Sequence, residues 1–254
     1  MPLLYPWANR LAVPRYRAAG REVTLDPSSP LLHLDDQGLL IHGVRWALLA
    51  WDVLTAEPDR LVARLDWSRP ELLAVFPFSH KVEMAATLCP ESLTIETTIM
   101  ADDPVPASFG FHPYFGLPGL PRAQWRLELP DMRKLVLDDR GIPNGEEQPF
   151  ELFNGPLGEL NLDAGFAVLD ERPKFSLTGA GRRITVELLE NYRYVQVFAP
   201  KSKDFVALEP MTAATNALVN GCGLGLVSPN RRFRAVFRIS VEPTSAPACD
   251  SSCD

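Results

Sequence analysis

The sequence predicts an all-β protein built as a large antiparallel sandwich, and three observations lead to this prediction. Apolar and polar residues alternate with a period of two over many segments, which is typical of strands with one buried face. Turn residues separate these segments at short intervals, as they do in antiparallel sheets. Proline occupies 24 of the 254 positions, and because helix interiors tolerate proline poorly, the chain is expected to contain only short elements.

The alternation defines the expected strands in chain order. In the segment SLTIETTIM, Leu93, Ile95 and Ile99 fall on one face and Glu96 on the other. The four clearest strands are 61–67, 92–100, 182–190 and 233–241. Shorter apolar runs indicate further strands at 38–44, 125–129, 134–138, 166–170, 174–178, 194–200 and 205–210. No amphipathic helix longer than two turns is predicted.

Domain organisation and charge narrow the classes of function. No linker-like Gly/Ser tract interrupts the chain, so we expect one sandwich domain over residues 1–243 and a disordered tail over 244–254. The net charge is −7, from 25 basic and 32 acidic residues, which disfavours nucleic acids and anionic membranes as partners. The sequence shows neither a transmembrane stretch nor a secretory signal, so a cytoplasmic location is expected.

Common cofactor and nucleophile motifs do not occur in this sequence. There is no GxSxG, GxxxxGK[ST], HExxH or Rossmann glycine pattern, which leaves the commonest hydrolase, nucleotide-binding and zinc-protease functions without support. The spacing of Cys89, Cys222, Cys249 and Cys253 fits no metal site, so free thiols and no metal are expected.

Two histidines have unusual neighbours. His42 lies between an apolar run and Gly43, and His112 lies in the aromatic segment SFGFHPYF, where Pro113 disfavours a helix. An apolar, partly desolvated setting is expected to keep the His112 imidazole titrating near neutral pH, as acid–base catalysis requires. The alternative is that this cluster is an aromatic corner of the core.

Glu209 is the strongest carboxylate candidate. It follows the apolar run FVAL and precedes Pro210, and glutamate is seldom buried unless it is paired or functional. Partial burial at the end of a strand would raise its pKa and suit it to act as a general base. The alternative is an ordinary carboxylate at a strand end.

Several segments together resemble a known family. In order along the chain these are LYPWANRLA, LLIHGVRW, PFSHKVEM, SFGFHPYF, LNLDAGF and ALEPMTAATNAL. They are similar to aldose 1-epimerases of the galactose mutarotase superfamily, and the similarity extends from Pro6 to about Val241. The resemblance implies an antiparallel β-supersandwich that works without a metal or an organic cofactor.

The resemblance also implies roles for six residues of this sequence. Glu209 matches the general base that takes the proton from the anomeric hydroxyl, and His112 matches the general acid that protonates the ring oxygen. His42 matches a second histidine near the ring oxygen. Arg10 and Asp163 match residues that contact sugar hydroxyls. Asn9 matches the residue that precedes this arginine in the family and supports its loop.

One departure concerns the first residues. Members of the family usually carry several tens of residues before the PWANR-like segment, so the sequence predicts a sandwich that lacks its first strands, either by natural shortening or because Met1 is not the natural start. An open sheet edge is then expected. The segment 14–30 is a candidate cap for that edge, and pairing of two copies is the rival, so the chain is expected to be a monomer or a homodimer.

Three functions remain open on these observations. The first is an isomerase that interconverts the anomers of free aldohexoses. The second is a hexose-6-phosphate 1-epimerase, which needs a basic phosphate pocket, for which Arg15, Arg17 and Arg21 are candidates. The third is a non-catalytic carbohydrate-binding protein, although binding alone does not require both His112 and Glu209.

Overall fold

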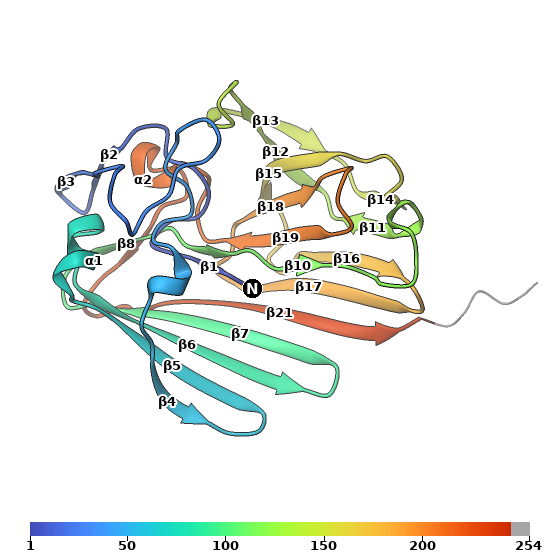
Figure 1. Cartoon of the computed structure of the whole chain (residues 1–254), viewed down its shortest axis with the longest axis horizontal. Helices are drawn as coiled ribbons and strands as arrows, with labels where there is room; N and C mark the ends of the chain where they lie inside the picture. Colours follow the sequence, from blue (N-terminus) through green and yellow to red (C-terminus); the bar gives the residue numbers. More distant parts are fainter. Residues whose placement is uncertain (245–254) are drawn as a thin grey trace, which may run out of the picture.

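The structure is a computed structural model that describes residues 1–244, and Figure 1 shows two large β-sheets. Apart from its first residue, the tail predicted at 244–254 lies outside the described residues. Every pairing between its named strands is antiparallel, as the sequence predicts.

The larger sheet has nine strands, and the four clearest period-two segments of the sequence are all interior strands of it. Its spatial order is β14 (Phe153–Pro156), β11 (Arg126–Leu129), β16 (Lys174–Gly179), β17 (Arg182–Glu190), β21 (Phe233–Pro243), β7 (Ser92–Met100), β6 (His80–Cys89), β5 (Arg60–Trp67) and β4 (Asp52–Ala56). The predicted strands 92–100 and 182–190 are confirmed residue for residue.

The smaller sheet has eight strands. Its order is β1 (Leu3–Leu4), β9 (Gly110–Phe111), β19 (Val206–Met211), β18 (Tyr194–Ala199), β15 (Leu162–Val168), β12 (Met132–Leu137) and β13 (Pro143–Phe150), with β10 (Tyr114–Phe115) also paired to β19. Two short pairs complete the described strands, β2 (Arg15–Ala18) with β3 (Arg21–Thr24) and β8 (Val105–Ala107) with β20 (Gly225–Val227).

The hydrophobic core lies between the two sheets. Val82 and Phe237 of the larger sheet belong to the same buried cluster as Phe166, Val197 and Leu208 of the smaller sheet. Because side chains alternate along a strand, the residues next to Val197 and Leu208, namely Gln196 and Glu209, lie on the opposite face of the smaller sheet. That face carries the candidate site.

Helical structure within the described residues is limited to short elements, as predicted. They are η1 (Trp46–Leu48), α1 (Pro70–Val75), η2 (Arg122–Gln124) and α2 (Ala217–Asn220). No helix in residues 1–244 is long and apolar enough to cross a membrane.

The strand predicted at 38–44 does not form, and backbone conformation explains the difference. This segment makes only isolated bridges, Arg10 with Ile41, Leu34 with Leu40 and Tyr5 with Gly43. His42 and Gly43 have φ angles of 63° and 66°, in the left-handed region that breaks an extended strand. A Cβ at position 43 would lie 2.2 Å from the Tyr5 carbonyl oxygen, so this close approach requires glycine.

The segment 14–30, expected to cap the open edge, contains the hairpin of β2 and β3, and its role as a cap stays a prediction. Strands β2 and β3 pair only with each other, so they add no strand to the edge of either large sheet. The edge strand β4 is exposed, with Val53 at 62% and Leu54 at 45% of full exposure. A monomer or an edge-paired homodimer therefore stays a prediction.

Candidate active site

The register of the smaller sheet places Glu209 and His112 opposite each other. Strand β19 pairs Met211 with Gly110 and Ala207 with Tyr114. The same register, continued two residues inward from either pair, sets His112 against Glu209. Their side chains meet there, with Glu209 Oε1 3.2 Å from His112 Nε2. Two residues nearly a hundred positions apart thus form an acid–base pair.

Burial sets the protonation of this pair. Glu209 is only 2% exposed, and burial, with a smaller effect of Asp163, raises the pKa of its carboxyl well above the usual range, against the opposing charge of Arg10. Burial also lowers the pKa of His112 to about 4, so the expectation of a near-neutral His112 is wrong. Desolvation disfavours the charged form of each group. Without a ligand, the Glu209–His112 pair therefore holds one proton, preferentially on the Glu209 carboxyl.

Tyr114 completes the surroundings of His112. Its ring stacks on the imidazole with centroids 4.3 Å apart and planes 14° from parallel. Its hydroxyl lies 3.1 Å from His112 Nε2, the same nitrogen that faces Glu209. The aromatic segment FHPYF was noted in the sequence, but this contact depends on how β10 follows Pro113 and could not be inferred from it.

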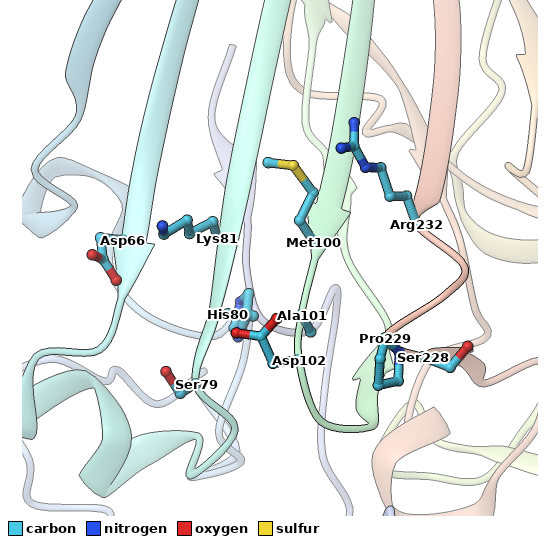
Figure 2. Close-up of a pocket in the computed structure, with 10 residues that line it drawn as sticks. All are labelled: Asp66, Ser79, His80, Lys81, Met100, Ala101, Asp102, Ser228, Pro229 and Arg232. Atoms are coloured by element: carbon cyan, nitrogen blue, oxygen red, sulfur yellow. The ribbon is translucent and has the colours of Figure 1, made fainter.

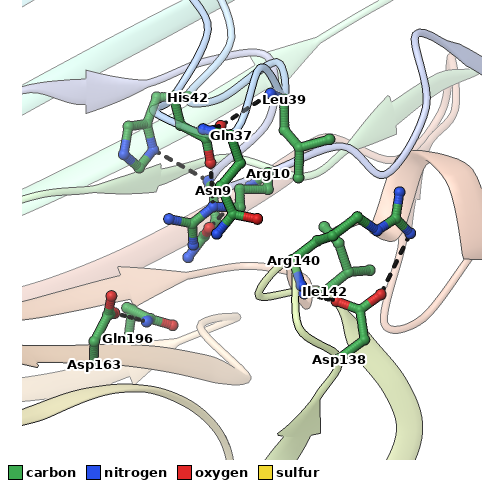
Figure 3. Close-up of polar contacts among 11 residues, drawn as sticks. Asn9, Arg10, Gln37, Leu39, His42, Asp138, Arg140, Ile142, Asp163 and Gln196 are labelled. Carbon is green, nitrogen blue, oxygen red and sulfur yellow. Dashed lines mark hydrogen bonds and ion pairs between the residues drawn. The ribbon is translucent and has the colours of Figure 1, made fainter.

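Asn9 and His42 hold each other through two hydrogen bonds. The Asn9 N–H donates to His42 Nδ1 at 3.2 Å, and the His42 N–H donates to the Asn9 carbonyl oxygen at 3.0 Å (Figure 3). Because Nδ1 accepts, the ring proton of neutral His42 lies on Nε2. Burial, assisted by the nearby His112, lowers the pKa of His42 to about 3, so its imidazole is a neutral donor at neutral pH.

Arg10 is oriented by a carboxylate that the sequence analysis missed. Asp35 Oδ2 accepts a hydrogen bond of 2.6 Å from Arg10 Nε, and Asp35 Oδ1 accepts the N–H groups of Gln37 and Leu39. Burial raises the pKa of Asp35, but the hydrogen bonds from Arg10 and these amides outweigh it, and the pKa is lowered overall. An Asp two residues before the Gln37–Gly38 pair signals a turn, yet nothing local identifies Arg10 as the partner of Asp35.

Asp163 has a partner on the neighbouring strand. In the β15–β18 register Asp163 lies opposite Phe198, and Gly165 lies opposite Gln196. The Gln196 side-chain amide reaches diagonally and donates to Asp163 Oδ1 at 2.6 Å (Figure 3). Gln196 is also the direct cross-strand neighbour of Glu209, so it belongs to the site although the sequence analysis did not select it.

One cavity brings all of the sequence-predicted site residues together. It has a volume of about 140 Å³ and is lined by Asn9, Arg10, Ile41, His42, His112, Asp163, Gln196, Phe198 and Glu209. On two of these lining residues, Glu209 Oε2 and His112 Nδ1 are buried without a hydrogen-bond partner. Unpartnered buried polar atoms are costly, so these two lining residues keep hydrogen-bonding capacity that a polar ligand could use.

Other parts of the described chain lack this combination of groups. A cavity of about 350 Å³ lies beside β6 and β7 (Figure 2), but its histidine, His80, already contacts the Tyr5 hydroxyl and the Phe78 carbonyl oxygen. Among residues 1–244, no group of three or more His, Cys, Asp or Glu side chains is arranged to hold a metal ion.

The arginines expected to form a phosphate pocket have other surroundings. Arg15 pairs with Glu22 within the β2–β3 hairpin, and Arg21 donates to the Pro77 carbonyl oxygen. Arg15, Arg17 and Arg21 do not line the cavity of Glu209 and His112.

Comparisons with known proteins agree with this architecture. A family model described as aldose 1-epimerase matches residues 1–240. The uncharacterized protein YihR of Escherichia coli K12 is 24% identical, over 93% of this chain and 77% of its own length.

Solved structures show the same fold. Slr1438 of Synechocystis sp. PCC 6803 is 25% identical, with a TM-score of 0.73 over 96% of this chain and 78% of its own. The GalM/aldose epimerase homologue of C. elegans is 16% identical, with a TM-score of 0.78 over 96% of this chain and 82% of its own.

Proposed function

Because this chain belongs to the aldose 1-epimerase family, we propose that it interconverts the α and β anomers of free aldohexoses by acid–base opening and closing of the ring. The observation that carries the proposal is the buried Glu209–His112 pair, 3.2 Å apart, whose two residues line one cavity. Such a pair supplies the base and the acid that ring opening of a hemiacetal needs.

The proposed reaction conserves the single proton of the pair. In the reactive form the proton lies on His112 and Glu209 is ionised. Glu209 takes the proton of the anomeric hydroxyl, the C1–O1 bond becomes a carbonyl, the C1–O5 bond breaks, and His112 gives its proton to O5. The pair is then a neutral acid and a neutral imidazole, which is the form that burial favours. Rotation about C1–C2 and the reverse transfers close the other anomer.

The other cavity residues suit substrate positioning. His42 presents an Nε2–H donor fixed by Asn9, and Arg10 is held by Asp35. Asp163 and Gln196 offer a carboxylate and an amide on the sheet side of the same cavity. These groups can hydrogen-bond the hydroxyls of an uncharged sugar, while Phe198 gives an apolar surface.

Replacement of the proposed base tests the function. Glu209→Gln keeps the shape of the side chain but cannot take a proton, so kcat is expected to fall by roughly 10²–10⁴, the usual contribution of a positioned base. Polarimetry of freshly dissolved α-D-glucose and α-D-galactose measures the rate above the spontaneous reaction. Glu83→Gln, on the strand β6 of the other sheet, is the matched control.

Two outcomes would contradict the proposal. If the unmodified protein does not accelerate anomer exchange of any aldose, the proposed enzyme activity is wrong, and a sugar-binding role becomes the better explanation. If Glu209→Gln retains the full rate, the activity stands but Glu209 is not its base.

A further inference from the structure

An aromatic side cavity adjoins the candidate active site. It has a volume of about 530 Å³ and shares His42 and His112 with the cavity of Glu209. Its lining also includes Leu4, His33, Val44, Arg45, Trp46 and Tyr114. Because His42 and His112 line both cavities, the side cavity lies directly next to a ligand bound at Glu209.

The lining of the side cavity favours a ring with an apolar face. Leu4 and Val44 are buried, whereas Trp46 and Tyr114 are 58% and 52% exposed. Two large exposed aromatic side chains beside an apolar cavity are typical of a ligand site, because their apolar ring surfaces stay in contact with water until a ligand covers them. A pyranose ring presents C–H groups on its faces, which pack on aromatic rings, and hydroxyls at its rim.

Polar groups in the side cavity are few and suited to hydroxyls. Arg45 donates from Nε to the Leu32 carbonyl oxygen at 3.1 Å, which leaves its terminal amino groups available. His33 Nδ1 is buried without a partner, and the His33 ring centroid lies 6.2 Å from that of His42. A volume of about 530 Å³ lies within the range of about 300–1,000 Å³ usual for small-molecule sites.

The position of the side cavity indicates which sugar carbon faces it. In the proposed reaction His112 meets the ring oxygen and Glu209 meets O1, while Arg10 and Asp163 meet ring hydroxyls. The ring oxygen is flanked by C1 and by C5, and C5 carries C6. Since O1 is directed to Glu209, the substituent that extends past His112, away from Glu209, is the one on C6.

We infer that the side cavity binds a second sugar ring attached through C6, so that 6-linked reducing disaccharides are substrates. The inference rests on the proposed function and adds its substrate class. A phosphate on C6 is disfavoured, because Arg45 is the one Lys or Arg among the described residues that line the side cavity, and the rest of the lining is largely apolar.

A substrate series on the unmodified protein tests this inference. Exchange NMR between the α and β anomeric protons gives kcat/KM for glucose, isomaltose, maltose and glucose 6-phosphate. Packing of one added ring on an aromatic side chain is expected to make kcat/KM for isomaltose roughly fivefold higher than for glucose. For maltose, whose second ring is attached through C4, kcat/KM is expected to be no higher than for glucose.

A variant at the aromatic wall gives a second readout. Trp46→Ala is expected to lower the ratio of kcat/KM for isomaltose to that for glucose by roughly fivefold. Leu48→Ala is the matched control, because Leu48 is an exposed residue of the same short helix and does not line the side cavity. It is expected to keep the ratio of the unmodified protein.

The outcomes separate this inference from the proposed function. Catalysis on glucose without any preference for isomaltose, or a ratio that is insensitive to Trp46→Ala, would overturn the second-ring site and leave the proposed function intact. An equal gain for maltose would overturn the assignment to C6. A preference for glucose 6-phosphate over isomaltose would show an anion site instead. No catalysis on any of the sugars would refute the proposed function itself.

Discussion

Asp35→Asn offers a sharp test of how the site holds its substrate. Asp35 Oδ1 accepts the N–H groups of Gln37 and Leu39 at 2.9 Å each, and an asparagine oxygen can keep both bonds. The other side-chain atom changes from an acceptor to a donor, and it faces Arg10 Nε, which is also a donor. The variant therefore keeps the turn and loses the anchor of the Arg10 guanidinium.

The expected magnitude follows from this contact. The Arg10 and Asp35 side chains are only 22% and 9% exposed, so solvent screens the pair less than it screens a surface ion pair. A hydrogen bond to a charged group contributes about 1.5–3 kcal/mol. At about 1.36 kcal/mol per tenfold, its loss lowers kcat/KM roughly 10- to 150-fold. In the proposed reaction Arg10 contacts hydroxyls that do not react, so most of the loss is expected in KM.

The assay compares mutarotation kinetics and thermal unfolding of three proteins. Asp138→Asn is the matched control, because Asp138 Oδ1 accepts the N–H groups of Arg140 and Ile142 in the same kind of turn and its other oxygen meets Arg140 (Figure 3). This control is expected to keep kcat/KM. An unchanged kcat/KM in Asp35→Asn, or an equal loss in both variants, would refute the argument that Asp35 positions Arg10.

Three further predictions concern the acid–base groups and the reaction conditions. The rate needs one proton on the Glu209–His112 pair, so kcat/KM is expected to fall as the pH drops through about 4, where His112 adds a second proton to the pair. On the alkaline side kcat/KM is expected to fall where the shared proton is lost, and the raised pKa of Glu209 moves this fall to higher pH than an ordinary carboxyl would give. In a pH–rate profile corrected for the spontaneous reaction, an acid-side decline that begins near pH 6.5 would contradict the low pKa of His112. His112→Asn is expected to lower kcat by roughly 10²–10⁴ and His42→Asn by less, because only His112 contacts Glu209; the reverse order in steady-state kinetics would exchange their roles. Extensive dialysis against a chelator is expected to leave the rate unchanged, and loss of activity that a divalent ion restores would show a metal requirement.

The sequence by itself determined the class of fold and the residue types of the site. The alternation in 92–100 requires an extended chain with one buried face, and Ile95, Thr97 and Ile99 are indeed buried. The segments around Asn9, His42, His112, Asp163 and Glu209 were likewise identifiable, because each motif is local in the chain. The strand expected at 38–44 failed for a local reason, since its apolar pattern conceals the left-handed backbone of His42 and Gly43.

Only the tertiary structure decided which groups meet and how they are charged. The partnership of Arg10 with Asp35, and that of Asp163 with Gln196, joins residues that are remote in sequence. The aromatic neighbours of His112 in the sequence predict partial desolvation, but the burial that lowers its pKa to about 4 is a property of the folded structure. Sequence periodicity records the face on which a side chain lies, whereas desolvation and hydrogen bonding depend on the three-dimensional distance to every other group.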